Sequence, residues 1–521
     1  MPHSPPFYKK SFPKAIGLSL AILIALWLLG YQGIAYVFQD NEISRSWWQL
    51  LFSRTTLLLA LGFGVFVAIK NKVWRQIRLK ANAFNLSIFR VIYFGFFSLG
   101  ALFFLPRLWQ QTTAFAALPP SARSEVAFAN FLPSILPHSS LLITLCVVLF
   151  FVAMVAACIG YKTKWAILLF SFCAFYLLGL PNFYGKINHN HHIIWFALVL
   201  AFSPCHEMWS VDAWLQKRKG IPITSRNALE YQLPFIILWS LMGLIYFFPG
   251  FWKLWTSGLD WALSSNLKFQ MQYKWLQLDQ WTPFFRIDQY PLLYRSAGLF
   301  VLLFEIFFCL FIWHPKTRII AICSGLIFHF SSWLFMDIFF VVLVLSYSSF
   351  IDWESLLVKK SSTQPPALSL SGLKTSFKAQ KITWLVGILL LGCNTVFGLA
   401  HVHSWPFTMY PTFENIQTAA TKTLVYRGRK ENGEYLDLSK RVLIQHYSSA
   451  RLWALEEDII ASIGESEGAY NKEILAHLMT LLSQEYPSLE TIRISISITS
   501  IDQTSLKEIH ESLFVDEISV D

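Results

Sequence analysis

The chain of 521 residues is 55% hydrophobic, 17% aromatic and only 14% charged, whereas a soluble globular chain carries about 25% charged residues. This composition excludes an ordinary soluble protein, a disordered chain and a small disulfide scaffold, and it predicts a polytopic membrane protein. The net charge of +11 does not indicate a nucleic-acid partner, because residues 412–521 hold 10 basic and 18 acidic residues and the positive excess lies on the hydrophobic part.

Eleven apolar runs are candidates for membrane spans. A bilayer core needs about 20 mostly apolar residues per helix, with about 17–25 the usual range. Two of the runs, 192–205 and 337–351, are short for a full span and are expected to be tilted or re-entrant. In chain order the runs are 14–38, 51–70, 85–106, 141–161, 164–181, 192–205, 231–249, 293–313, 318–335, 337–351 and 383–402.

Basic segments between the runs set the expected orientation, since loops rich in lysine and arginine stay in the cytoplasm. If all eleven apolar runs cross the membrane, every basic segment lies on the same face of it. The N-terminus is then cytoplasmic and the acidic C-terminal part is extracytoplasmic, in a bacterial inner membrane or an equivalent one. The segments are Lys9–Lys14, Lys70–Lys80, Lys162–Lys164, Lys217–Lys219, Lys316–Arg318 and Lys359–Lys381.

The expected fold class is an all-α polytopic membrane helix bundle of about 11 spans, with a small C-terminal α+β domain outside the cytoplasm. The chain is expected to divide into two N-terminal transmembrane helices with a basic cytoplasmic loop (1–80), a central transmembrane domain (81–355), a cytoplasmic linker (356–382), a last transmembrane helix with a WPF-x-x-YP segment (383–411), and the acidic domain (412–521).

The acidic domain has the pattern of an α+β fold. An Asn-Gly pair between two short β-prone segments predicts a hairpin. Two amphipathic stretches predict helices, and a later run of strict alternation predicts a half-buried strand. The segments are strands at 422–427 and 434–438, helices at 451–463 and 470–484, and a strand at 492–498.

Lys253 follows an apolar run and is flanked by Phe251, Trp252 and Trp255. Ionisable groups at membrane depth are expensive and mark candidate functional sites. A lysine packed among aromatic rings loses hydration and becomes a candidate general base. The alternative is a lysine whose ammonium reaches the membrane surface beside an aromatic belt.

A second candidate site is the cluster His189, Asn190, His191 and His192. Imidazoles there can stabilise an oxyanion or carry protons near neutral pH. A metal site is not predicted, because no carboxylate or cysteine lies at ligand spacing. The alternative is a polar loop that caps the helix beginning near His192.

Glu305 and His329 lie inside neighbouring apolar runs and are candidates for a pair or a shared cavity. Polar residues in such runs also serve to hold helices together. The sequence has no P-loop, GxSxG or HExxH motif, which argues against ATP-driven, serine-hydrolase and metalloprotease chemistry. An apolar pocket with lysine and histidine near one membrane face suits a hydrophobic cofactor or a lipid substrate.

Several segments between about residues 80 and 355 form a distinctive pattern through their order, their spacing and their positions relative to the predicted spans. They are NLSIFRVIYFGF (Asn85–Phe96), GYKTKW (Gly160–Trp165), GKINHNHH (Gly185–His192), WSVD (Trp209–Asp212), PGFWKL (Pro249–Leu254), FEIFF (304–308) and IFHFSSWLF (Ile327–Phe335). This pattern resembles the HTTM (horizontally transferred transmembrane) family, which includes the vitamin K-dependent γ-glutamyl carboxylases.

The resemblance implies an enzyme that uses reduced vitamin K, a menaquinol-type quinone, with O2 and CO2 as co-substrates and no metal. In the family, a lysine in the motif matched by PGFWKL deprotonates the quinol, and O2 converts it to an epoxide through a strongly basic alkoxide. That base removes the γ-proton of a peptide glutamate, and the carbanion adds CO2. The lysine corresponds to Lys253, the histidine of the carboxylation step to His192, and a further histidine to His329.

The sequence also departs from the family pattern. The family motif has two adjacent lysines, and Trp252 stands at the first of them; a family asparagine corresponds to His191. The animal enzymes have a large lumenal region that grips a propeptide, whereas only about 110 residues follow the last predicted span. The predicted catalytic residues are Lys253, His192 and His329, and the predicted substrate or cofactor contacts are His191, Asn190, Trp252, Trp255 and Glu305.

Three functions stay open from the sequence. The first is a carboxylase-type lyase that couples quinol epoxidation to glutamate carboxylation. The second is an HTTM-fold membrane enzyme that acts on another apolar substrate without carboxylation. The third is a non-enzymatic membrane scaffold whose C-terminal domain binds a partner. The expected partners are the lipid bilayer, an apolar quinone, and a peptide or protein on the extracytoplasmic side.

Overall fold

The computed structural model describes residues 24–39, 41–70, 81–118, 120, 123, 126, 129–132, 138–220, 228–278, 281–358, 380–417, 420–463, 469–501 and 508–519. The start of the first predicted span, the basic loop at 71–80 and most of the predicted linker at 356–382 lie outside these residues.

Within the described residues, eight helices are long and apolar enough to cross a membrane. They are α2 (Glu42–Lys70), α3 (Ala83–Ala117), α5 (Ser140–Ile159), α6 (Thr163–Gly179, continued by the 3-10 turn η3 at Leu180–Phe183), α9 (Ala228–Ser257), α12 (Pro291–Phe311), α13 (Pro315–Met336) and α17 (Lys381–Leu399). A mostly helical fold with long apolar helices is therefore confirmed.

Three shorter apolar helices lie at the other predicted runs, and the count of eleven crossings stays a prediction. They are a helix at Ile24–Val37, α7 (His191–Ala201), and Val341–Phe350, which comprises α14 (Val341–Ser346) and η5 (Tyr347–Phe350). The remaining short helices are α8 (Val211–Arg218), α10 (Asp260–Leu263), α11 (Asn266–Gln277), η4 (Ile287–Gln289) and α15 (Trp353–Leu357).

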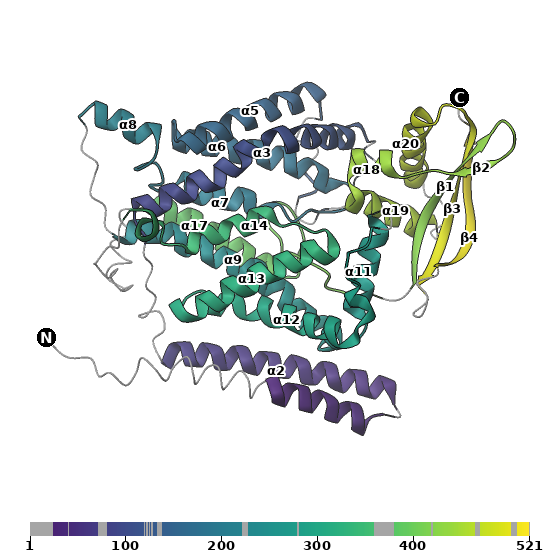
Figure 1. The fold of residues 1–521 in the computed structure, drawn as a ribbon, viewed down its shortest axis with the longest axis horizontal. Coiled ribbons are helices and arrows are strands. Elements are labelled where there is room, and N and C mark those ends of the chain that lie inside the picture. The colour runs from purple at the N-terminus through teal and green to yellow at the C-terminus, as the bar shows by residue number, and fades with distance from the viewer. Residues whose placement is uncertain are drawn as a thin grey trace.

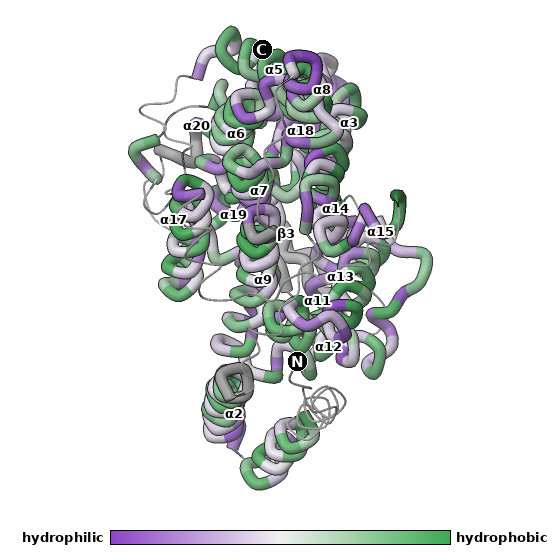
Figure 2. The backbone as a smooth tube through the Cα atoms, turned by 90° about the vertical axis from the view of Figure 1, so that its left-hand side faces the viewer, coloured by the Kyte–Doolittle hydropathy of each residue, from purple (hydrophilic) through white to green (hydrophobic). Residues whose placement is uncertain are grey.

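The outer surface of the bundle is apolar. Leu99, Leu102 and Leu141 are 84%, 85% and 81% exposed, and such leucines face a favourable environment only where lipid replaces water. Figure 2 shows hydrophobic residues along most of the helices, with a hydrophilic stretch at α8. The basic helix α8 lies at one end of the bundle and the C-terminal domain at the other (Figure 1).

The C-terminal domain is a four-stranded antiparallel sheet with three helices between it and the bundle (Figure 1). The strand order is β2-β1-β3-β4. The predicted hairpin, the two predicted helices and the predicted strand are confirmed, whereas α18 and β4 were not predicted. The elements are β1 (Ala420–Lys430), β2 (Tyr435–Asp437), α18 (Arg441–Tyr447), α19 (Ser449–Ile463), α20 (Ala469–Glu485), β3 (Leu489–Ile501) and β4 (Glu508–Ser519).

Arg451 on α19 fixes this domain to the loop that follows η3. Arg451 is 3% exposed, and its guanidinium donates to the carbonyl of Pro181 and to Asn182 Oδ1 at 2.8 Å, both in η3, and to the carbonyl of Lys186 in the loop at 2.8 Å. Gly185 makes the close approach possible: it has a φ of +68°, and a Cβ there would lie 3.2 Å from Ala454 Cβ. The domain and the loop therefore form one packed unit.

Removing the Arg451 guanidinium is expected to loosen the domain. Arg451→Ala leaves the buried acceptors unpaired and should lower the stability of the domain interface by about 1.5–3 kcal/mol. Limited proteolysis of the full protein should then separate the domain from the bundle faster. Arg427→Ala is the matched control, because its ion pair with Asp437 is exposed and such pairs contribute about 0–1 kcal/mol. Equal proteolysis of both variants would contradict the anchoring role.

Candidate active site

Lys253 lies in a buried ion pair between α9 and α12. Its Nζ donates to Glu305 Oε1 at 2.7 Å and to Oε2 at 2.8 Å, and both residues are 2% exposed. The two helices approach closely at Gly250, where a Cβ would lie 2.7 Å from Glu305 Cβ. Since Lys253 follows Gly250 by about one helical turn, its side chain reaches the carboxylate directly.

The ring beside the ammonium is Trp261 of α10, with its centroid 4.7 Å from Lys253 Nζ. The predicted neighbours Trp252 and Trp255 lie on other faces of α9. Trp252 donates to Gly398 O on α17 at 2.8 Å, and the ring of Trp255 lies 5.0 Å from the guanidinium of Arg54 on α2. An ammonium held between a carboxylate and an indole face has no contact with bulk water.

His329 on α13 belongs to a buried hydrogen-bonded row. Tyr347 Oη donates to Tyr246 Oη at 3.1 Å, and Tyr246 Oη lies 2.6 Å from His329 Nε2. Because Tyr246 accepts from Tyr347, we assign the Tyr246 hydroxyl proton to the bond with Nε2 and the ring proton of His329 to Nδ1. That Nδ1 has no hydrogen-bond partner among the described residues. Glu305 and His329 do not pair with each other.

His192, in the first turn of α7, has a comparable arrangement. Tyr410 Oη accepts from the His192 amide at 3.1 Å and lies 2.8 Å from His192 Nδ1. The other possible acceptor for the Tyr410 hydroxyl is His189 O, which is 3.5 Å away. We therefore infer that the Tyr410 hydroxyl donates to His192 Nδ1, which carries no proton of its own. His192 Nε2 is then an N–H donor, and it is buried with no partner in the part of the chain that the structure describes.

The other residues of the histidine cluster surround this position. His191 Nε2 lies 2.7 Å from Ser404 O, and the ring of His191 lies 4.8 Å from that of Trp405. Asn190 is the N-cap residue of α7 but makes no side-chain capping bond. The ring of His189 stacks on those of His403 and Tyr410 at 5.5 and 5.3 Å.

The loop histidines are neutral at neutral pH. Burial is the main cause that lowers the pKa of His403 to about 4, with a smaller contribution from the Lys186 ammonium and against a hydrogen bond to Ile187 O that raises it. Burial, followed by the charges of His403 and Lys186, holds the pKa of His189 well below its usual range. Neutral imidazoles can donate or accept hydrogen bonds without adding charge to the site.

The ion pair, the Tyr246–His329 pair and the Tyr410–His192 pair are three buried polar groups, and no hydrogen bond among the described residues joins one group to another. They lie within electrostatic range of one another, Tyr246 of Glu305, Tyr410 of Tyr246 and His192 of His329, and we refer to them together as the polar array. The array comprises Lys253, Glu305, Tyr246, His329, His192 and Tyr410.

The tyrosines and Trp261 were missed by sequence reasoning. Tyr246 precedes Lys253 by seven residues, so the two share a helix face, and this spacing is a usable signal. Tyr410 belongs to the WPF-x-x-YP segment, for which the sequence predicts no function. Nothing in the sequence places Trp261 or Tyr347 beside these residues.

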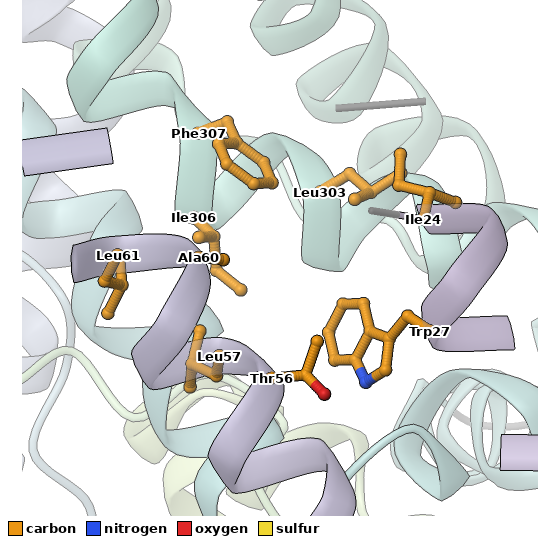
Figure 3. Close-up of a pocket in the computed structure, with 9 residues that line it drawn as sticks. All are labelled: Ile24, Trp27, Thr56, Leu57, Ala60, Leu61, Leu303, Ile306 and Phe307. Carbon is orange, nitrogen blue, oxygen red and sulfur yellow. The ribbon is translucent and has the colours of Figure 1, made fainter. Parts of the chain in front are cut away.

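A separate apolar pocket lies between the helix at Ile24–Val37, α2 and α12 (Figure 3). Its walls carry no charged side chain, and the one hydroxyl among them, of Thr56, is bonded to Phe52 O at 2.8 Å. Such a pocket suits hydrocarbon rather than a polar group. Its lining residues are Ile24, Trp27, Thr56, Leu57, Ala60, Leu61, Leu303, Ile306 and Phe307.

The described residues contain no group of three or more histidine, cysteine, aspartate or glutamate side chains that could hold a metal ion. Comparison of the chain with protein-family models, with curated proteins and with solved structures gave no match. The function is therefore argued from the residues of the array.

Proposed function

We propose that the protein is an integral membrane enzyme of the HTTM type, in which Lys253 deprotonates a reduced quinone and drives epoxidation coupled to glutamate carboxylation. The observation that carries the proposal is the amine of Lys253, held without contact to water between Glu305 and Trp261, in one array with two imidazoles. Buried ionisable groups of this kind cluster at active sites.

The residues fit a reduced quinone. His192 Nε2 and His329 Nδ1 are buried, and neither has a partner within the described residues. We infer that both are N–H donors, which suits the oxygens of a deprotonated quinol, and the aromatic side chains nearby suit a flat apolar ring. When bound, reduced vitamin K supplies, with O2, the strong base that removes a glutamate γ-proton.

Lys253 becomes a base by passing its proton to Glu305. In the ion pair the proton is on Nζ, and its transfer across the 2.7 Å hydrogen bond gives a neutral amine and a neutral carboxylic acid. The amine can then take a proton from a quinol hydroxyl, while Glu305 holds the amine in place.

The two histidines stabilise the negative charge that this proton transfer creates. With Tyr246 and Tyr410 assigned as the donors to one ring nitrogen of His329 and of His192 respectively, the ring proton of each histidine is assigned to the other nitrogen. Neutral N–H donors can stabilise this negative charge without a counter-ion. No second carboxylate is therefore needed beside the histidines, and Glu305 is the only carboxylate of the array.

The proposal is tested on the purified protein in lipid nanodiscs with reduced vitamin K, O2, labelled bicarbonate and a glutamate-containing peptide. Epoxide formation together with label fixed in the peptide is the expected result. Epoxide without fixed label would overturn the carboxylation step and assign the second function. Neither product, from protein that is folded and membrane-inserted, would overturn the quinol chemistry and leave an enzyme that acts on another apolar substrate or the scaffold.

A further inference from the structure

The turn between α5 and α6 packs against the start of α8, at the end of the bundle opposite the C-terminal domain (Figure 1). Asp212 of α8 joins the two segments. Its Oδ1 accepts from the Lys162 amide at 2.8 Å, and its Oδ2 accepts from the amide and the hydroxyl of Thr163 at 2.8 and 2.7 Å. Gly160 has a φ of +72°, and a Cβ there would overlap the side chain of Ser210. The turn and α8 therefore form one surface.

The buried guanidinium of Arg90 fixes this surface from within the bundle. Its Nη1 donates to two carbonyls near the end of α5 at 2.7 and 2.8 Å, and its Nη2 donates to Trp209 O at 2.5 Å. Lys162 and Trp209 have φ values of +44° and +49°, a conformation that costs energy in residues other than glycine. The bonds from Asp212 and Arg90 hold both residues in it, so their side chains start from a fixed backbone.

Exposed cations gather on this surface. They come from two of the basic segments that set the expected orientation, 162–164 and 217–219, which the fold brings together. Within the described residues none of these cations forms an ion pair with a carboxylate. Asp212 already accepts three hydrogen bonds. Such a concentration of positive charge attracts an anion. The cations that carry the argument are Lys162, Lys217, Arg218 and Lys219.

Exposed indole rings lie among these cations. Trp165, Trp209 and Trp214 are 67%, 62% and 54% exposed. The guanidinium of Arg218 lies 4.6 Å from the centroid of the Trp214 ring, one helical turn away on α8. Tryptophan is enriched at the level of lipid headgroups, because it combines a large apolar ring with one N–H donor. The surface therefore combines positive charge with side chains that suit a membrane interface.

The position of the turn identifies the anion. The turn joins α5 and α6, which are both long and apolar enough to cross a membrane, and a turn between two such helices lies at the level of the lipid headgroups. Phospholipid phosphates are the anions that surround the cations at this depth. Indoles that enter the headgroup layer also gain apolar contact, which a lipid provides and a dissolved ion does not.

We propose that this surface, the α8 platform, binds the phosphate groups of anionic phospholipids in the leaflet at its end of the bundle. The platform consists of Lys162, Trp165, Trp209, Trp214 and the run Lys217–Lys219. Each cation near a membrane surface strengthens the association with anionic lipid by about fivefold. None of these residues belongs to the polar array, so the platform does not rest on the proposed function.

The test measures how strongly spin-labelled phosphatidylglycerol and spin-labelled phosphatidylcholine associate with the full protein in phosphatidylcholine bilayers. Wild type should bind phosphatidylglycerol about tenfold more strongly than phosphatidylcholine. The triple variant with Lys217→Gln, Arg218→Gln and Lys219→Gln should reduce this preference to about twofold or less. Lys217→Arg combined with Lys219→Arg should keep the preference, because both substitutions retain the charge.

Arg218→Gln and Arg295→Gln form a matched pair of single variants. Arg295 is also exposed, lies 5.9 Å from the ring of Tyr294 and is near the start of the apolar helix α12. No other charged residue occurs between Pro291 and Val301, so Arg295 is not part of a run of cations. Arg218→Gln should lower the preference by about fivefold, whereas Arg295→Gln should leave it unchanged.

The lipid and a dissolved anion are distinguished in the same experiment. Inorganic phosphate, added at constant ionic strength, should not displace the labelled phosphatidylglycerol, whereas a higher salt concentration should weaken the preference because exposed charges are screened. Equal association of the two lipids with wild type, or an unchanged preference in the triple variant, would overturn the platform. Displacement of the labelled lipid by inorganic phosphate would overturn the lipid as its ligand and assign a site for a soluble anion.

Discussion

Glu305→Ala is expected to lower the free energy of unfolding by about 3–5 kcal/mol, because it leaves the buried ammonium of Lys253 without its partner. Glu305 is the only carboxylate among the described residues that contacts Lys253, through both oxygens at 2.7 and 2.8 Å. The substitution also opens a gap beside Gly250, where α9 and α12 lie close together. Unfolding of the protein in mild detergent, driven by titration with a denaturing detergent, measures the loss.

Glu305→Gln separates charge from packing in this prediction. The amide keeps the shape of the side chain and one acceptor for Lys253 Nζ, so the loss of stability should be smaller than for alanine. A decrease of less than about 1 kcal/mol in the free energy of unfolding of Glu305→Ala is what an exposed ion pair would give. That result would contradict a buried Lys253–Glu305 pair.

Lys253→Met is expected to reduce epoxide formation from reduced vitamin K by about 10²–10⁴-fold, the usual contribution of a positioned general base. Methionine fills similar space beside Trp261 but cannot accept a proton. Because it also leaves Glu305 unpaired, the single variant alone does not distinguish lost chemistry from lost stability.

The double variant Lys253→Met with Glu305→Leu makes this distinction. Replacing a buried ion pair by apolar residues is often neutral or stabilising, so this variant should be as stable as wild type to within about 1 kcal/mol and still inactive. Lys164→Met is the matched control, since Lys164 also lies over an aromatic ring, 5.2 Å from Phe202, but is exposed. Recovery of activity in the double variant would remove Lys253 from the chemistry.

The positions of the helices could be predicted from the sequence because a membrane span is a local property. About 20 apolar residues define it without knowledge of any other part of the chain. The hairpin at β1 and β2 is local in the same way, since its turn is set by Asn432 and Gly433. Strand β4 was not predicted, because its segment, EIHESLFVDEIS, alternates only in part and becomes a strand by pairing with β3.

The partners within the site could not be predicted, because they depend on how helices pack. The sequence indicates Lys253 and Glu305 separately, each as a charged residue in an apolar run. Their pairing follows from the close approach at Gly250, and the turn from α9 into α10 that brings Trp261 over the ammonium leaves no local signature. Arg451 belongs to no sequence motif, and only the folded domain shows that it holds the loop before the histidines.

The most direct test of the central claim is epoxide formation by Lys253→Arg. Arginine keeps the positive charge and can keep a bidentate pair with Glu305, so the protein should remain folded, but a guanidinium does not release its proton at usable pH. The account predicts folded protein with epoxide formation reduced by about 10²-fold or more. Folded Lys253→Arg protein that forms epoxide at a rate within a few-fold of wild type would contradict Lys253 as the base.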